Sequence, residues 1–276
     1  MEIYSVNIRM ATAEKLRALV QYDLDLKTRA ARQEHPTRYA VPGLVTKTQL
    51  AQLEADGYEV EIVADLSLVA PERLSEVSRV NRFADARGVL DFEGRTILGY
   101  MTVDEVEAAL INLQIAHPDL VTLLPLPFTT WEGRTSRAVR VRAGTTVNRA
   151  GVLFTGSIHA REWGGSDILI NLLLRLIGAY RSFSALNFGG KSFSAAQVRV
   201  ILENLDLFVF PDVNPDGKHF SQTTNPGSGN PQNTWWRKNR NPNTATGGGA
   251  RGVDLNRNFD FLWNSGIGTS TSPNSM

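Results

Sequence analysis

The sequence has no cysteine, and only four of its 276 residues are histidine. The absence of cysteine excludes disulfide bonds, thiolate nucleophiles and thiolate metal ligands, so a bound metal would need histidine or carboxylate ligands. No apolar run is long enough to span a membrane, and the segment MEIYSVNIRM lacks the basic start and apolar centre of a signal peptide. The net charge is only +1 and no extended basic face is present, which argues against nucleic acid or an anionic membrane as a partner.

What the sequence does have is enough apolar material for a packed core, since 42% of its residues are hydrophobic. Residues 1–70 repeat a strand–helix–strand pattern, with IYSVNIRM and RYAVPGLV as strands before helices that start near Thr12 and Thr46. Thr46 and Gln49 fit a capping box at the start of the second helix. Two copies are too few to stack as a helical repeat array, so the pattern predicts a small ferredoxin-like α+β module.

Residues 71–97 lose the apolar period and are rich in arginine and acidic residues. They indicate a linker, which the sequence leaves open as either a solvated helix between domains or a processing site. Residues 98–276 then form a second domain. Thr102 and Glu105 fit a capping box for a helix that ends at His117, and a longer helix is expected within WGGSDILINLLLRLIGAY. Strands are expected at residues 121–126, 138–141, 151–158 and 205–210, and a shorter helix at 195–202. This alternation predicts an α/β sheet covered on both faces.

The segment GSIHAREWGG lies between an expected strand and the long helix. It places His159 at the carboxyl end of the strand and Glu162 in the first turn of the helix, which is where open α/β sheets bind ligands. An imidazole and a carboxylate three residues apart can bind one Zn²⁺ ion. On its own the pattern is common, and a helix N-terminal glutamate near a polar loop histidine is then the better interpretation.

Three further segments add to this one: PDVNPDGKHF from Pro211, TWWRKNRNPN from Thr234 and GVDLNRNFDFLW from Gly252. Together with IHAREW, and in this order, they resemble the zinc carboxypeptidase family. The resemblance extends upstream through YMTVDEVEAALINLQIAHPDLV and WEGRTSRAVRV. It implies that residues 98–276 are the first part of an α/β/α mixed-sheet carboxypeptidase domain, and the amino-terminal module is similar to the propeptide fold of some members.

The resemblance also implies roles for individual residues. His159 and Glu162 match two of the family's three zinc ligands. Arg237 matches the catalytic arginine that polarises the scissile carbonyl and stabilises the developing oxyanion, a role that suits a preorganised cation. Asn256 and Arg257 match the pair that binds the terminal carboxylate of the substrate, and a guanidinium can pair with a carboxylate through two hydrogen bonds.

Two more residues complete the implied site. Arg161 matches a secondary substrate-binding arginine, and Asp254 matches a carboxylate that orients the His159 ring. Simpler interpretations exist, because Arg237 could be a loop cation beside a tryptophan pair and NPDG could be a simple turn. The remaining histidines are expected to be ordinary polar residues: His35, His117 and His219.

The family's third zinc ligand (a histidine), its catalytic glutamate, its substrate-capping tyrosine and its specificity pocket all correspond to positions beyond Met276. After Asp260 the sequence has no histidine or glutamate. We therefore expect a zinc metallocarboxypeptidase that hydrolyses the last peptide bond of peptides or proteins, represented here by a chain that is a fragment or has lost the chemistry. The expected partner is a peptide carboxyl terminus, the expected state a monomer, and family habit favours an extracellular location. Two alternatives remain: a zinc deacylase of small N-acyl amino acids, and a non-catalytic module that binds peptide carboxyl termini.

Overall fold

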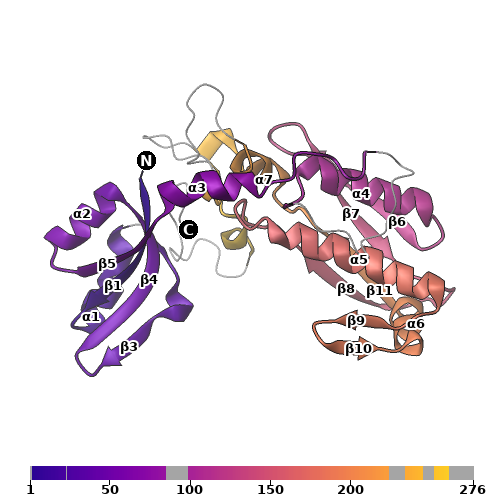
Figure 1. Ribbon diagram of the computed structural model, residues 1–276, viewed down its shortest axis with the longest axis horizontal. Helices are drawn as coiled ribbons and strands as arrows, with labels where there is room; N and C mark the ends of the chain where they lie inside the picture. The colour runs from indigo at the N-terminus through magenta and orange to yellow at the C-terminus, as the bar shows by residue number, and fades with distance from the viewer. Residues whose placement is uncertain (1, 23, 85–98, 224–233, 245–251, 261–276) are drawn as a thin grey trace. The chain divides into compact units, whose positions relative to one another are not determined.

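The computed structural model describes residues 2–22, 24–84, 99–223, 234–244 and 252–260 (Figure 1). Contacts divide the chain into two units: unit 1 comprises Met1–Ser75 and Phe220–Met276, and unit 2 comprises Glu76–His219. Each unit is described by itself. Among the described residues, no helix combines the length and apolar character needed to cross a bilayer.

Unit 1 is built on an antiparallel sheet. Its strands are β1 (Ile3–Met10), β2 (Asp25–Leu26), β3 (Arg32–His35), β4 (Arg38–Thr46) and β5 (Glu59–Asp65). Its helices are α1 (Ala13–Ala18), α2 (Lys47–Ala55) and α3 (Leu66–Ser75), with 3₁₀ turns η1 (Leu19–Tyr22), η2 (Thr28–Ala30), η4 (Pro242–Thr244) and η5 (Leu255–Arg257). The strand order is β2-β4-β1-β5, and β3 pairs with β4. A strand–helix–strand unit has thus been used twice in one antiparallel sheet, which confirms the predicted ferredoxin-like module.

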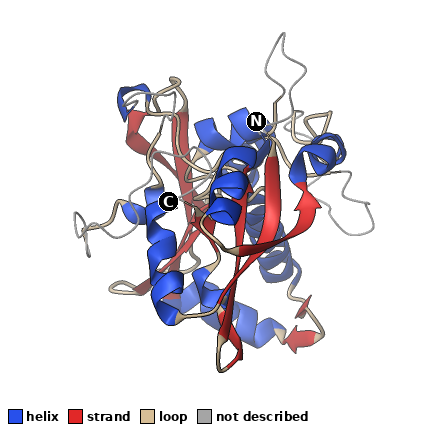
Figure 2. Cartoon of the chain, turned by 90° about the vertical axis from the view of Figure 1, so that its left-hand side faces the viewer, coloured by secondary structure: helices blue, strands red, loops and turns tan. Residues whose placement is uncertain are grey.

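The alternation of side chains along β1 explains how this sheet packs. Val6, Ile8 and Met10 are buried and form one cluster with Leu19 and Leu53. Figure 2 shows the strands of the chain in red and its helices in blue. The predicted capping box of α2 is present, because the side chains of Thr46 and Gln49 each bind the backbone N–H of the other residue. Ile3, whose side chain lies on the other face of β1, belongs to a separate cluster.

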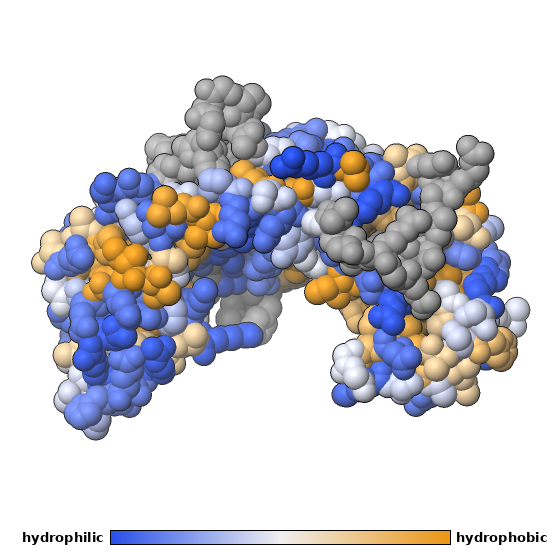
Figure 3. Space-filling model, viewed as in Figure 1, coloured by the Kyte–Doolittle hydropathy of each residue, from blue (hydrophilic) through white to orange (hydrophobic). Residues whose placement is uncertain are grey.

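This separate cluster joins the two chain segments of unit 1. Ile3 packs with Leu66 and Trp235, and the indole Nε1 of Trp235 donates a hydrogen bond to the Leu66 carbonyl at 3.2 Å. Part of the apolar surface of the unit is exposed to solvent. Leu68 is 77% exposed, and Figure 3 shows apolar patches around α3.

Unit 2 contains a four-stranded mixed sheet and a small hairpin. Its strands are β6 (Val121–Thr129), β7 (Thr135–Val141), β8 (Ala150–Thr155), β9 (Leu186–Phe188), β10 (Lys191–Phe193) and β11 (Leu205–Phe210). Its helices are α4 (Val103–Ala116), α5 (Gly164–Ser182), α6 (Ala195–Asn204) and α7 (Pro215–Ser221). The sheet order is β6-β7-β11-β8, with β7 antiparallel to β6 and β11, and β8 parallel to β11. The predicted α/β class with a mixed sheet is confirmed.

One core cluster lies between this sheet and three helices. Side chains from α4, α5 and α6 meet the alternate residues Val139 and Val141 of β7 and Leu207 and Val209 of β11. Val152 of β8 packs against this core, whereas the next residue, Leu153, is 65% exposed. The core therefore holds β8 and β11 side by side, so that their carboxyl ends lie at the same edge of the sheet.

Residues 71–97 were predicted to form one linker, but different parts of this range have different outcomes in the structure. Residues 71–75 belong to α3, and 85–98 lie outside the described residues. Residues 76–84 belong to unit 2, where Arg82 Nε binds the fully buried Glu105 carboxylate at 2.7 Å. Glu105 also forms the predicted capping box of α4 with Thr102. Both functions proposed for the linker stay predictions.

Asp167, in the first turn of α5, carries a carboxylate that is strongly desolvated. Its Oδ1 accepts a hydrogen bond from the Met101 N–H at 3.0 Å, and Oδ2 has no hydrogen-bond partner within the described part of the chain. Burial raises the pKa of this carboxyl above its ordinary value. The folded state therefore holds the proton more tightly than the unfolded chain does, and stability falls as pH rises through the interval between the two pKa values.

We predict that Asp167→Asn raises the melting temperature near neutral pH and changes it little near pH ~3, where the carboxyl is protonated in both states. Calorimetric scans at both pH values would measure this difference. Asp104→Asn is the matched control, because Asp104 also lies in the first turn of a helix but is exposed. A lower melting temperature for Asp167→Asn at neutral pH would contradict the prediction.

Candidate metal and substrate site

The loop between β8 and α5 is shaped by a close crossing of two backbone segments. A Cβ atom added to Gly156 would lie 2.6 Å from the Pro211 carbonyl oxygen, and one added to Gly165 would lie 2.9 Å from the Ser157 nitrogen. Ser157 itself adopts a left-handed backbone with φ of 50°. Such a conformation is costly for a residue with a side chain, so the surrounding contacts must maintain it.

This loop brings the two predicted metal ligands together. His159 Nδ1 lies 2.8 Å from Glu162 Oε1, and the Glu162 N–H donates to the His159 carbonyl at 3.1 Å. The imidazole is buried, whereas the Glu162 side chain is 54% exposed. Glu162 lies in the loop, two residues before α5 begins at Gly164, so its predicted place in the first helical turn is wrong. The helix starts later than its apolar period suggests, because the backbone at Gly165 passes close to that of Ser157.

The two donor atoms fit a zinc ion. Zn²⁺ binds histidine nitrogen and carboxylate oxygen at about 2.0–2.2 Å, so two donors about 3 Å apart can reach the same ion. No group of three histidine, aspartate or glutamate side chains suited to a metal occurs among the described residues. The described residues therefore offer two candidate zinc ligands, and a complete zinc site needs at least one more.

Among the remaining residues of the loop, some are buried in the protein and others are partly exposed to solvent. Ala160 is fully buried, and Trp163 is 1% exposed with its ring edge against Tyr100 at a centroid distance of 5.7 Å. Arg161 lies between them and is half-buried. The anchors keep the loop against unit 2 and leave Arg161 and Glu162 partly open to solvent, as substrate-binding and metal-binding side chains require.

The NPDG segment after β11 is a helix start, and its interpretation as a simple turn is wrong. Asn214 Oδ1 accepts a hydrogen bond from the Gly217 N–H at 3.1 Å, and Pro215 is the first residue of α7, where proline has no N–H to leave unsatisfied. The Asn214 amide also donates to the Ile158 carbonyl at 3.3 Å. This segment therefore directly supports residues 156–163, the loop that carries the two candidate metal ligands and is called the metal-ligand loop below.

The other predicted site residues lie in unit 1, on residues 234–244 and 252–260. Gly252 has a φ of 90°, and a Cβ there would lie 2.1 Å from the Asn239 carbonyl oxygen. Asn239 and Val253 exchange two hydrogen bonds, at 3.0 Å and 2.8 Å. Glycine at 252 thus allows the two loops to pair side by side.

An ion pair joins the same two loops. The Nε of Arg237, which is 8% exposed, donates to Asp254 Oδ2 at 2.9 Å. Asp254 Oδ1 accepts from the Asn256 N–H at 2.9 Å, which starts the turn η5. The predicted interaction in which Asp254 orients the His159 ring would join unit 1 to unit 2, and it stays a prediction.

Asn256 and Arg257 differ from Arg237 in their environment. Both side chains are exposed, and Arg257 Nη1 donates to the Asn256 carbonyl at 3.0 Å. Their proposed binding of a terminal carboxylate also stays a prediction. The structure thus brings together His159 with Glu162 in unit 2, and Arg237 with Asp254, Asn256 and Arg257 in unit 1.

The sequence interpretation missed a set of buried polar residues beneath the metal-ligand loop. They are Ser157, Ser166, Asp212 and Lys218. Serine and aspartate beside the motifs gave no signal of their own, and a lysine in the middle of NPDGKHF is indistinguishable by pattern from a solvated one.

Comparisons with known proteins agree with this arrangement. A family model described as zinc carboxypeptidase matches residues 106–276. Metallocarboxypeptidase A of Trichophyton tonsurans is 37% identical over 145 residues, which cover 51% of this chain and 28% of that protein. Carboxypeptidase B of Helicoverpa zea is 28% identical over 276 residues, which cover 95% of this chain and 56% of that protein. The crystal structure of carboxypeptidase A from Helicoverpa armigera has the same fold, with a TM-score of 0.67 at 20% identity, covering 99% of this chain and 61% of that one.

The chain therefore spans little more than half of the insect relatives and about a quarter of the fungal one. The family model nevertheless covers more than half of this chain, including both groups of site residues. Zinc is the metal that the family description names. On this evidence, the chain belongs to the zinc carboxypeptidase family.

Proposed function

We propose that this chain contributes the first part of a zinc metallocarboxypeptidase, which hydrolyses the last peptide bond of a peptide or protein. The observation that carries this proposal is the 2.8 Å approach of His159 Nδ1 to Glu162 Oε1 at the carboxyl end of β8. A complete site for this reaction also needs a third zinc ligand and a general base.

His159 and Glu162 would hold the zinc ion. When bound, zinc lowers the pKa of a water molecule and polarises a carbonyl group. The chain's own contribution is to fix the two donors: burial holds the His159 ring, and the loop backbone brings Glu162 to the same point. A carboxylate that stays half-exposed can still exchange its histidine partner for a metal ion without unfolding the loop.

Arg237 would stabilise the oxyanion that develops on the scissile carbonyl. Its Nε is fixed by Asp254, so one of its five donors sets the plane of the guanidinium before substrate arrives. Fixed donors are effective in catalysis because they need no reorganisation during the reaction. Asn256 and Arg257 are exposed and suit recognition of a terminal carboxylate, with Arg161 as a further binding group.

We also propose that the protein acts as a monomer on peptide carboxyl termini, without nucleic acid, and in the extracellular space. The near-neutral charge supports the absence of nucleic acid as a partner. The location rests on family resemblance alone.

Zinc binding tests the metal site. Because two protein ligands are present instead of three, we expect the chain to bind zinc weakly and His159→Ala to abolish that binding, measured by isothermal titration calorimetry. His35→Ala is the control, since His35 lies on the exposed strand β3 of unit 1 and should leave zinc binding unchanged. Tight stoichiometric zinc binding that survives His159→Ala would refute the assignment of the site.

Recognition of a carboxyl terminus tests the second group of residues. We expect the chain to bind a peptide with a free carboxylate better than its amidated form, and Arg257→Ala to weaken this preference about tenfold, as loss of a hydrogen bond to a charged group would. Arg257→Lys should weaken it less, because the charge remains while the two-pronged geometry is lost. Titrations followed by tryptophan fluorescence would measure these affinities, with the exposed Arg79→Ala as control. Equal affinity for both peptides would contradict the proposal.

A further inference from the structure

Four polar side chains form a buried cluster directly beneath the metal-ligand loop. Lys218 and Ser166 have no exposed surface, and Ser157 and Asp212 are 4% and 7% exposed. They come from four separate segments of unit 2: the loop after β8, the first turn of α5, the loop after β11, and α7. No role in the proposed hydrolysis uses any of them.

A continuous set of contacts runs from the lysine to the metal-ligand loop. Lys218 Nζ donates to Ser166 Oγ at 2.7 Å and approaches the two Asp212 oxygens at 3.1 Å and 3.3 Å. Ser166 Oγ also donates to Asp212 Oδ1. Ser157 Oγ lies 2.8 Å from Ser166 Oγ and donates to the carbonyl of Glu162 at 3.3 Å. The ammonium group is thus three contacts away from the backbone of a metal ligand.

The cluster acts on the loop where the loop is most strained. Ser157 holds the left-handed conformation, and its hydroxyl is the group that bridges Ser166 and Glu162. The segment that carries Asp212 supports the same loop, because the Val213 N–H donates to the Gly156 carbonyl at 3.1 Å. A left-handed serine costs of order 1–3 kcal/mol, so it persists only where such contacts determine it.

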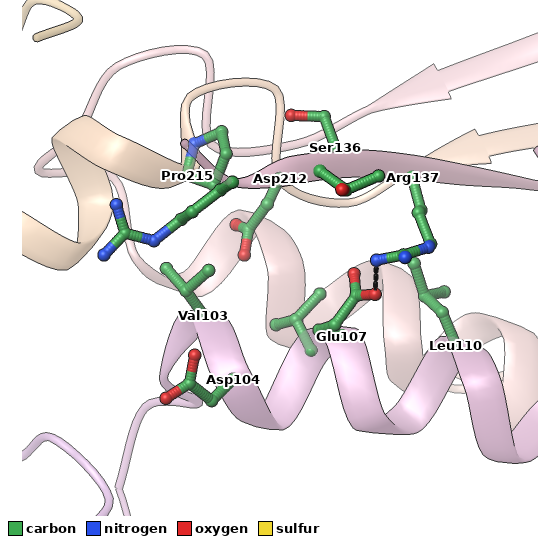
Figure 4. Close-up of a pocket in the computed structure, with 11 residues that line it drawn as sticks. Val103, Asp104, Glu107, Leu110, Ser136, Arg137, Asp212 and Pro215 are labelled. Atoms are coloured by element: carbon green, nitrogen blue, oxygen red, sulfur yellow. Dashed lines mark hydrogen bonds and ion pairs between the residues drawn. The ribbon is translucent and has the colours of Figure 1, made fainter. Parts of the chain in front are cut away.

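Packing alone would not keep Asp212 in place. Asp212 lines a cavity of about 170 Å³ between α4 and the start of β7, together with Val103 and Glu107 (Figure 4). The cavity leaves room on the α4 side of the carboxylate. Among the described residues, the polar contacts of the Asp212 carboxylate come from Lys218 and Ser166, on the side away from this cavity's α4 wall.

We propose that Lys218 is a positioning residue for the metal site. Paired with Asp212, it fixes Ser166 and Ser157, and these hold the loop 156–163 in the conformation that brings His159 Nδ1 to Glu162 Oε1. The inference rests on the proposed function for the identity of the metal, but its claim about the loop conformation stands on the contacts of the cluster.

The test compares the full chain with its Lys218→Met variant. Methionine preserves much of the apolar volume and removes the ammonium group. We expect zinc alone, titrated in competition with a chromophoric chelator, to bind the folded variant about tenfold more weakly, as for other residues that support metal ligands indirectly. We also expect faster hydrogen exchange of the backbone amides of residues 156–163 in the metal-free protein.

Arg82→Met is the matched control. It also removes the cation from a buried ion pair of unit 2 and leaves Glu105, which is fully buried, without that partner. Its contacts lie at the start of α4 instead of the metal-ligand loop. It should lower stability while leaving both the zinc affinity of the folded protein and the exchange of residues 156–163 unchanged.

Ser166→Ala covers the case in which Lys218→Met does not fold, because it keeps both charges and removes only the link between them and Ser157. It should show the same weaker zinc binding and faster exchange. Unchanged affinity and exchange in the folded variants, or equal changes in Arg82→Met, would overturn the inference. If the wild-type chain binds no zinc through His159, the proposed function fails, and hydrogen exchange alone still decides whether the cluster positions the loop.

Discussion

Buried charges in the described part of the chain include three ion pairs that join different segments of the protein. Lys218 with Asp212 ties α7 to the end of β11, and Arg82 with Glu105 ties residues 76–84 to α4. Arg237 with Asp254 ties together two loops of unit 1. Removing one partner of a buried pair costs about 3–5 kcal/mol, because the remaining charge has lost both water and its counterion. Each pair therefore specifies which loops meet, whatever its net contribution to stability.

Two of these pairs lie directly behind side chains of the candidate site. The Lys218 pair lies beneath the loop with His159, and the Arg237 pair includes a candidate catalytic group itself. Functional loops are ordinarily the less stable parts of a fold, since they have few apolar contacts. Here buried polar contacts supply the order that apolar packing does not. The glycines at 156, 165 and 252 contribute by allowing the backbones to approach closely enough for these contacts to form.

Much of this fold could be predicted from periodicity and capping residues. Sufficient signals were the strand segments IYSVNIRM and RYAVPGLV, the capping boxes at Thr46 and Thr102, and the apolar face of α5. The start of α5 was not predicted, because Gly165 packs closely against Gly156 and Ser157, and Gly156 in turn packs against Pro211 in the loop after β11, which is far away in the sequence. The start of α7 was also missed, since Asn-Pro-Asp-Gly suits both a turn and a helix that begins at proline.

The candidate site shows the same division between local and distant information. His159 and Glu162 are three residues apart, so the sequence could indicate their meeting; the Lys218 cluster draws on four segments, and no local pattern could indicate it. Burial of a lysine is rare without a partner, so a sequence alone favours a solvated side chain.

The two arginines of unit 1 show why burial matters as much as residue type. Arg237 is buried and fixed through its Nε by a carboxylate, whereas Arg257 is exposed and its Nη1 donates to a neighbouring carbonyl. An oxyanion that exists only in the transition state is best met by donors that are already oriented and sheltered from water. A carboxylate that arrives from solution is best met by a cation that can reach it and then form two parallel hydrogen bonds. The environments of the two residues thus favour a catalytic role for Arg237 and a recognition role for Arg257.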